Sequence, residues 1–231
     1  MLKVKEVIGK ALSEGRKGLL EPEAKTICKE YGIPTPEFAL AKNVDEAIDF
    51  SEKIGYPVVL KIVSPDIIHK TEAGGVLIDL KNRNDVKKGF KKILENSKNY
   101  KPDARIVGVL VQKMAPQSTE IIVGGIKDPQ FGSTLMFGLG GIFVEVLKDV
   151  TFRVVPITEE DAKEMIKEIK AYPVLKGYRG QKPRDEDAIT KILLASSRLM
   201  LENEEIDQMD LNPIMVYERG ASVVDARIIL A

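Results

Sequence analysis

The chain contains a single histidine, His69, in a stretch whose residue types could support chemistry. This stretch, SPDIIHKTEAGGV, places the imidazole among charged residues, shortly before Gly74 and Gly75. A neutral imidazole is a nucleophile and proton carrier near pH 7. A glycine pair lets backbone N–H groups approach a phosphate closely, although an ordinary turn uses the same two residues. His69 is therefore either a reactive group or a surface histidine without a role.

Lys61 is the second residue of interest, because it interrupts the apolar run PVVLKIV. An unpaired ammonium group inside such a strand is costly. Its end must therefore reach solvent or meet an anion such as a phosphate, and the sequence leaves both possibilities open. The phosphate-binding motif GxxxxGK[ST] is absent, so this chain is not a P-loop protein.

Oxygen-bearing side chains recur near the C-terminal end. Asp210 and Asn212 are two residues apart on an expected strand, so they project from one face. A two-residue turn at 219–220 would place Asp225 opposite Ile214, on that same face and diagonal to Asn212. Such ligands suit Mg²⁺ that bridges phosphates.

The alternative for Asp225 is an ion pair with Arg227 or Lys61. We favour the metal, since the three oxygen-bearing side chains converge with no basic residue between them. Glu120, at the head of EIIVGGIKDPQFG, could accept a hydrogen bond from a ribose hydroxyl or simply face solvent.

Composition excludes several classes of protein. With one histidine and one cysteine, Cys28, the chain can form neither an internal disulfide nor a His/Cys zinc cluster. The motif GxSxG is absent. The 35 basic and 35 acidic residues balance, and no basic face with interleaved aromatic residues predicts nucleic-acid binding. No apolar run predicts a membrane span or a signal peptide, so we expect a cytoplasmic protein.

Helices and strands alternate along the sequence in an order that does not suit one doubly wound parallel sheet. Ser64-Pro65-Asp66 predicts a single helical turn before His69. We expect two αβ lobes, at 1–113 and 114–231. Apolar spacing predicts helices near 4–12, 21–31, 45–54, 85–96 and 188–201, and Thr158 opens another. Val4, Val7, Ile8 and Leu12 share one face of the first helix, and Cys28 lies on the inward face of the second. Strands are expected near 38–41, 57–63, 76–80, 105–112, 120–127, 134–137, 151–156, 208–217 and 222–230.

Taken together, these segments resemble the ATP-grasp fold, an α/β (α+β) fold whose two αβ lobes hold a nucleotide between them. More closely, the chain resembles the β subunits of archaeal ADP-forming acetyl-CoA synthetases, which are relatives of succinyl-CoA synthetase. The resemblance covers nearly the whole chain, and its motifs are specific only in combination. They are VVLKIVSPDIIHKTEAGGV, EIIVGGIKDPQFG, GLGGIFVEVLKDVTFRVVPI, LKGYRG, MDLNPIMV and VVDARI.

The resemblance implies a nucleotide site for ATP or ADP with Mg²⁺. Lys61 matches the lysine that contacts the nucleotide phosphates, and Glu120 matches the acidic residue near the ribose. Asn212 and Asp225 match magnesium ligands. The backbone of the hinge between the lobes would read adenine, and the glycine pair would border the phosphates. These last positions are Gln112, Lys113, Met114, Gly74 and Gly75.

The resemblance also gives His69 a role. It matches the histidine that this family phosphorylates, and Asp210 matches an acidic position that steadies the phosphohistidine. The implied reaction is acyl-CoA + ADP + phosphate ⇌ carboxylic acid + ATP + CoA. Because the chain lacks a GxGxxG domain for CoA, a CoA-binding α subunit is implied, in an α₂β₂ heterotetramer. The LKGYRG loop, with Lys176 and Arg179, would meet phosphate or this partner, or be a plain surface loop.

Three other functions remain open at this level. A stand-alone ATP-grasp ligase would join a carboxylate to an amine without needing His69. A regulatory subunit would bind nucleotide without chemistry, and a sensor domain could be the remnant of a fused acyltransferase. The sequence reveals neither the acyl group nor the choice between ADP and GDP.

Overall fold

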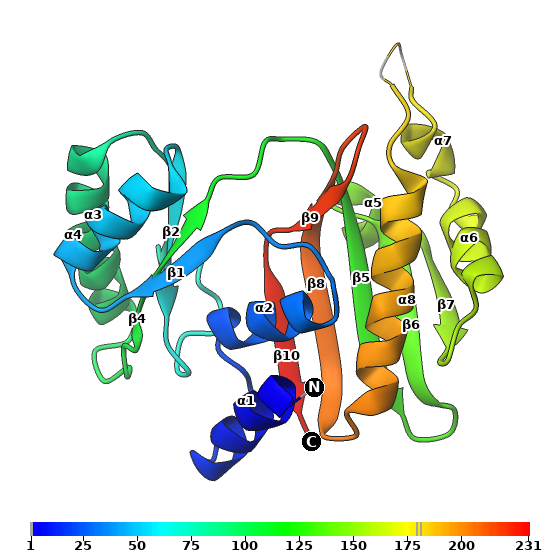
Figure 1. The fold of residues 1–231 in the computed structure, drawn as a ribbon, viewed down its shortest axis with the longest axis horizontal. Helices are drawn as coiled ribbons and strands as arrows, with labels where there is room; N and C mark the ends of the chain where they lie inside the picture. Colours follow the sequence, from blue (N-terminus) through cyan, green and yellow to red (C-terminus); the bar gives the residue numbers. More distant parts are fainter. Residues whose placement is uncertain (1, 179, 181) are drawn as a thin grey trace. The chain divides into compact units, whose positions relative to one another are not determined.

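A computed structural model describes residues 2–178, 180 and 182–231. The chain divides into two compact units (Figure 1). The smaller unit comprises Leu20–Pro22 and Pro36–Ala115, and the larger unit comprises Met1–Leu19, Glu23–Thr35 and Pro116–Ala231. The cut near residue 115 lies close to the expected boundary at 113–114. The first 35 residues differ from expectation, because all but three of them group with the C-terminal part of the chain.

The smaller unit is a four-stranded antiparallel sheet with two helices packed on one face (Figure 1). The strand VVLKIV lies inside this sheet, and every one of its residues is buried. Residues of that strand, of the strand Gly108–Lys113 and of both helices contribute to the unit's apolar core. In sheet order the strands are β1 (Phe38–Ala41), β4 (Gly108–Lys113), β2 (Val58–Val63) and β3 (Val76–Leu80), and the helices are α3 (Val44–Ile54) and α4 (Arg83–Tyr100).

Local signals in the sequence set most of these boundaries. Asn43 caps α3 by accepting a hydrogen bond from the Glu46 N–H, and Gly55, with φ of 84°, ends that helix. Helix α4 begins earlier than expected, because Asn82 caps it by accepting from two backbone N–H groups. The predicted strands at 38–41 and 76–80 are confirmed.

The larger unit is a second antiparallel sheet, in the order β10-β8-β5-β6-β7 with β9 beside β8. Helix α8 lies across these strands and beside α6 (Figure 1). The strands are β5 (Thr119–Asp128), β6 (Gly132–Leu139), β7 (Val150–Val154), β8 (Ile206–Val216), β9 (Ala221–Val223) and β10 (Ala226–Leu230). The helices are α1 (Leu2–Ser13), α2 (Glu21–Glu30), α5 (Ile142–Glu145), α6 (Glu159–Glu168), α7 (Tyr172–Leu175) and α8 (Glu186–Glu202).

The N-terminal segment belongs to the larger unit because its apolar side chains enter that unit's core. Val4, Ile8 and Ile27 are buried in the same cluster as residues of β5, β8 and β10. Leu12, expected on this inward face, is instead 44% exposed. Cys28 is buried, as the helical spacing predicts, and burial raises the pKa of its thiol to about 12. Cys28 is therefore a core residue rather than a reactive thiol.

The register of the C-terminal hairpin differs from the predicted one. Tyr217 N–H donates to the Gly220 carbonyl at 3.0 Å, so Glu218 and Arg219 are the turning residues. Gly220 follows the turn with a φ of 79°, and its N–H donates to the Asp185 carboxylate at 2.6 Å. Shifting the turn by one residue shifts the strand pairing by two. Asp225 therefore lies opposite Asn212 instead of Ile214.

Within the part of the chain that the structure describes, no helix is long and apolar enough to cross a membrane.

Candidate active site

His69 lies in the loop that connects β2 to β3, and its imidazole side chain is 65% exposed. Its Nδ1 atom is 3.8 Å from the Glu72 carboxylate, which is also exposed. The predicted helical turn at 64–66 is wrong, since the chain only bends there. Asp66, expected in the first turn of a helix, instead accepts a hydrogen bond from the Arg105 N–H at 2.7 Å.

A hydrogen-bonded turn follows His69 and fixes the base of this loop. Ala73 N–H donates to the His69 carbonyl at 3.1 Å, and Gly75 N–H donates to the Lys70 carbonyl at 2.7 Å. Gly74 has a φ of 59°, in the left-handed region that glycine tolerates. A Cβ atom at Gly75 would lie 2.5 Å from Cγ2 of Ile62. The glycine pair therefore serves a tight turn against β2, while the imidazole stays exposed.

Lys61 meets an anion, but the anion is a carboxylate of the chain itself. Its Nζ lies 2.7 Å from Oε1 of Glu21, and the two side chains are 5% and 4% exposed. The other oxygen of Glu21 accepts a hydrogen bond from Lys70, the neighbour of His69. Sequence reasoning missed Glu21, because no local pattern joins it to a lysine 40 residues away.

Of the expected hinge residues, Gln112 and Lys113 are the last two residues of β4, and Met114 follows that strand. Gln112 is completely buried, and the Lys113 ammonium donates to the carbonyls of Gly55 and Tyr56 at 2.9 Å each. The backbone N–H groups of Lys113 and Met114 donate to carbonyls of the smaller unit, at 2.8 and 3.1 Å. These two N–H groups are thus already used in holding the smaller unit together.

In the larger unit, a pocket of about 520 Å³ lies on one face of the sheet, lined by residues of β5, β6, β7, β8 and β10. Apolar side chains form much of its wall, including Ile122, Met136 and Phe152. Asp210 and Asn212 line the same pocket. The predicted grouping of oxygen-bearing side chains on one face of β8 therefore borders a real concavity.

Acidic and basic side chains lie close together at this pocket. The pKa of Asp210 is raised, first because burial removes water from its carboxyl and second because of the negative charge of Asp225. Arg227, which lies opposite Asp210 on β10, lowers that pKa in part. The expectation that no basic residue lies among these oxygen-bearing side chains is therefore wrong, because Arg227 pairs opposite Asp210 and lines the same pocket.

These residues fit a magnesium ion by their chemistry. Asn212 lies on β8 and Asp225 lies between β9 and β10, and a hydrogen bond of 3.2 Å runs from the Asn212 N–H to the Asp225 carbonyl. Magnesium takes oxygen ligands from one or two carboxylates and completes its shell with water and phosphates. Among the described residues, no group of three or more His, Cys, Asp or Glu side chains could hold a metal by itself. The fit therefore depends on the Asn212 amide together with Asp225.

Glu120 is the second residue of β5, where it pairs with Met215, and its side chain is exposed. Its carbonyl accepts a hydrogen bond from the Gly140 N–H at 2.8 Å. The carboxylate is thus accessible to a ligand.

The ATP-grasp domain family matches residues 10–230 of the chain. The β subunit of acetate–CoA ligase [ADP-forming] I from Pyrococcus furiosus is 58% identical over 99% of this chain and 98% of its own length. The chain belongs to the family of ADP-forming acetate–CoA ligase β subunits. In Archaeoglobus fulgidus, acetate–CoA ligase [ADP-forming] I is 50% identical over 99% of this chain, which spans only 33% of that longer relative. A β subunit of this family therefore has a partner, fused to it in some relatives.

Solved structures agree with this family assignment. Acetyl-coenzyme A synthetase 1 of Candidatus Korarchaeum cryptofilum, in complex with coenzyme A and Ca-AMPCP, superimposes with a TM-score of 0.97 at 52% identity, over 98% of this chain and 99% of that one. Another structure of that enzyme, with Mg-AMPPCP, has its phosphohistidine segment pointing towards the nucleotide binding site; its TM-score is 0.88 at 49% identity, over 99% of this chain and 100% of that one. The predicted ATP-grasp fold is confirmed.

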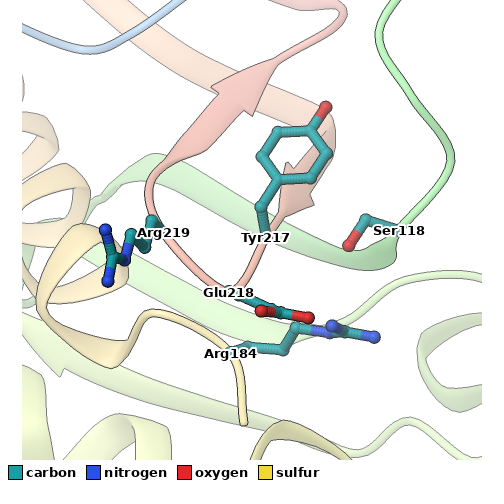
Figure 2. Close-up of a pocket in the computed structure, with 5 residues that line it drawn as sticks. All are labelled: Ser118, Arg184, Tyr217, Glu218 and Arg219. Atoms are coloured by element: carbon teal, nitrogen blue, oxygen red, sulfur yellow. The ribbon is translucent and has the colours of Figure 1, made fainter. Parts of the chain in front are cut away.

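A second pocket, of about 510 Å³, lies beside the C-terminal hairpin and contains none of the predicted site residues of the family (Figure 2). It is lined by Ser118, Arg184, Tyr217, Glu218 and Arg219. Arg184 donates to Thr119 Oγ1 at 2.8 Å, so its guanidinium group helps to hold the start of β5.

The LKGYRG loop carries two residues for which the sequence suggested phosphate or partner contacts. Lys176 lies 3.4 Å from the Glu186 carboxylate and above the ring of Tyr172. Arg179 lies outside the described residues. The contacts of Lys176 fit an ordinary surface loop of this β subunit.

Proposed function

We propose that this chain performs the ATP-forming half of the reaction acetyl-CoA + ADP + phosphate ⇌ acetate + ATP + CoA, with His69 as the phosphoryl carrier. The observation that carries the proposal is the exposed imidazole on a loop whose base is fixed by a hydrogen-bonded turn. A carrier must meet two different reactants, and an exposed loop residue can do so. The relatives' names and the phosphohistidine segment of the Korarchaeum enzyme support this assignment.

The transfer has two balanced steps. In the first, an imidazole nitrogen of His69 attacks the phosphorus of acetyl phosphate; the N–P bond forms, and the P–O bond to acetate breaks with its electron pair leaving on acetate. In the second, an oxygen of the ADP β-phosphate attacks the same phosphorus and the N–P bond breaks, which returns the electron pair to the imidazole. The proton on the second ring nitrogen is retained throughout.

Charged residues in both units serve this transfer. Lys61 neutralises phosphate charge from β2, and Asp210 accepts a hydrogen bond from the second ring nitrogen of phosphorylated His69. Asn212 and Asp225 hold Mg²⁺, which supplies positive charge at the phosphate oxygens when it is bound. The proposal keeps Glu120 at the ribose, Gly74 and Gly75 beside the phosphates, and the Gln112–Met114 segment at adenine.

The acetyl phosphate is made by a partner, a CoA-binding α subunit, in an α₂β₂ heterotetramer. The proposal rests on the relatives named as β subunits and on the single-chain Archaeoglobus relative, of which this chain spans 33%.

The test is brief incubation of the purified chain with γ-labelled ATP and Mg²⁺, followed by analysis for acid-labile, alkali-stable phosphate. We expect label in the wild-type chain that added ADP returns to ATP, and none in His69→Ala. If the chain remains unlabelled even with its partner subunit present, the carrier mechanism is wrong.

A further inference from the structure

Glu21 contacts both the lysine assigned to nucleotide phosphates and the loop that carries His69. Its Oε1 lies 2.7 Å from the Nζ of Lys61, and its Oε2 accepts a hydrogen bond from Lys70. The Glu21 side chain is 4% exposed, and that of Lys70 is 18% exposed. A single buried carboxylate thus joins a strand lysine to a loop lysine.

The two lysines differ in what holds their backbones. Lys61 lies inside β2, paired with Val76 of β3 on one side and Leu110 of β4 on the other. Lys70 lies in the loop, directly after His69. Because a strand paired on both sides moves little, the contact between Glu21 and Lys61 fixes Glu21, and the contact with Lys70 then ties the loop to it.

A phosphate group can displace such a carboxylate from a lysine. A phosphoryl group carries more negative charge than a carboxylate and presents more acceptor oxygens, and lysine binds it as a point charge. Lys61 can therefore exchange Glu21 for a nucleotide phosphate. The carboxylate is then reoriented, because one of its lysine partners has changed.

We propose that Glu21 is a positioning residue for phosphoryl transfer, which holds the His69 loop through Lys70 until nucleotide phosphate takes Lys61. This inference rests on the proposed function, since it assumes that Lys61 binds phosphate and that His69 moves. It makes the position of the loop depend on whether nucleotide is present. In this role Glu21 acts through the two lysines rather than on the reacting atoms.

Hydrogen–deuterium exchange of the loop tests this proposal without relying on catalysis. The amides of Ala73 and Gly75 donate to the carbonyls of His69 and Lys70, so their protection reports whether the turn is held. We expect several-fold faster exchange at these amides in Glu21→Gln and in Lys70→Gln than in the wild-type chain. Lys70→Gln leaves the buried pair of Glu21 and Lys61 in place, so it separates the tether from a general loss of folding.

Glu30→Gln is the matched control, because it removes the same charge from the same helix, where Glu30 pairs only superficially with Lys3 at 3.2 Å. Its loop exchange should equal that of the wild-type chain. Adding ADP should speed amide exchange of the loop in the wild-type chain. It should not do so in Lys61→Met, because this variant has no lysine at position 61 to bind the phosphate.

Unchanged exchange in both Glu21→Gln and Lys70→Gln would overturn the proposal, as would an ADP response that survives in Lys61→Met. Either result would leave the labelling of His69 intact. Failure of the proposed function would instead show as an unlabelled wild-type chain, so the two ideas fail in different measurements.

Discussion

At the scale of single residues, Glu21 and Lys61 bring opposite charges into the interior on side chains that are 4% and 5% exposed. Removing one member of a buried ion pair leaves the other charge in an unfavourable environment, which costs about 3 kcal/mol. We expect Lys61→Met to lower the free energy of unfolding by at most about this amount, because Glu21 keeps Lys70 as a partner. The double variant Glu21→Gln/Lys61→Met should lose less than the sum of the single variants, because it leaves neither charge behind. Denaturant unfolding of the four chains measures this coupling, and strictly additive losses would contradict it.

The same pair shows what single residues reveal before a structure is known. Lys61 can be identified from sequence because a charge inside an apolar strand demands a partner. His69 can be identified because it is the chain's only imidazole. Glu21 cannot be identified from sequence, because its lysine partners lie 40 and 49 residues away. An acidic residue at the start of a helix is also common enough to draw no attention.

At the scale of elements, the loop between β2 and β3 depends on the close approach of Gly75 to its neighbours. A Cβ atom there would lie 2.5 Å from Ile62 Cγ2 and 3.0 Å from the Lys70 carbonyl. Because both neighbours belong to packed backbone or core, Gly75→Ala should destabilise the chain by about 1–3 kcal/mol. Gly18→Ala is the control, since its Cβ would meet nothing within 4 Å and, like Gly75, it does not have a positive φ. A loss at Gly75 no larger than that at Gly18, measured by thermal unfolding, would contradict this account.

Asp185 joins the start of α8 to the C-terminal hairpin, and its charge gives stability a pH dependence. Backbone N–H groups of Gly220 and Ala188 donate to its carboxylate and hold its pKa below the ordinary value. A depressed folded pKa means that the contribution is present above the unfolded pKa, about 3.9, and is lost as pH falls through the folded pKa. Asp185→Asn should therefore be less stable than the wild-type chain at pH 7, with the gap closing in acid. A gap that stays constant from pH 7 to pH 2 would contradict the assignment.

The elements were predictable where their signals are local. The Asn43 cap and the capping box of Thr158 and Asp161 are visible in the sequence and present in the structure. The hairpin register was not predictable, because the turn is held by Asp185, 35 residues before Gly220. An error of one residue in the turn moved Asp225 by two positions along β8.

At the scale of the whole molecule, a division into two αβ lobes was predictable and the course of the first 35 residues was not. Helices α1 and α2 show ordinary amphipathic spacing, which predicts a buried face without saying which core receives it. In the structure their apolar residues join the core of the larger unit, although Leu20–Pro22 belongs to the smaller one. The placement of Leu20–Pro22 in the smaller unit brings Glu21 into contact with Lys61 and with the His69 loop.

As an isolated β subunit, the chain should catalyse only part of the overall reaction. It should exchange label between ATP and His69 alone, yet release ATP from acetyl-CoA, ADP and phosphate only after a CoA-binding α subunit is added. Assaying both reactions with and without that subunit shows which reaction each subunit supports. ATP formation from acetyl-CoA by this chain alone would contradict it.

The central claim is that His69 carries the phosphoryl group, and localising that group tests it most directly. The chain would be incubated with Mg²⁺-ATP, digested under alkaline conditions and analysed by mass spectrometry before and after a chase with ADP. The account predicts one phosphoryl group on the peptide containing His69, lost when ADP is added. A phosphoryl group on another residue, or one on His69 that ADP cannot remove, would contradict it.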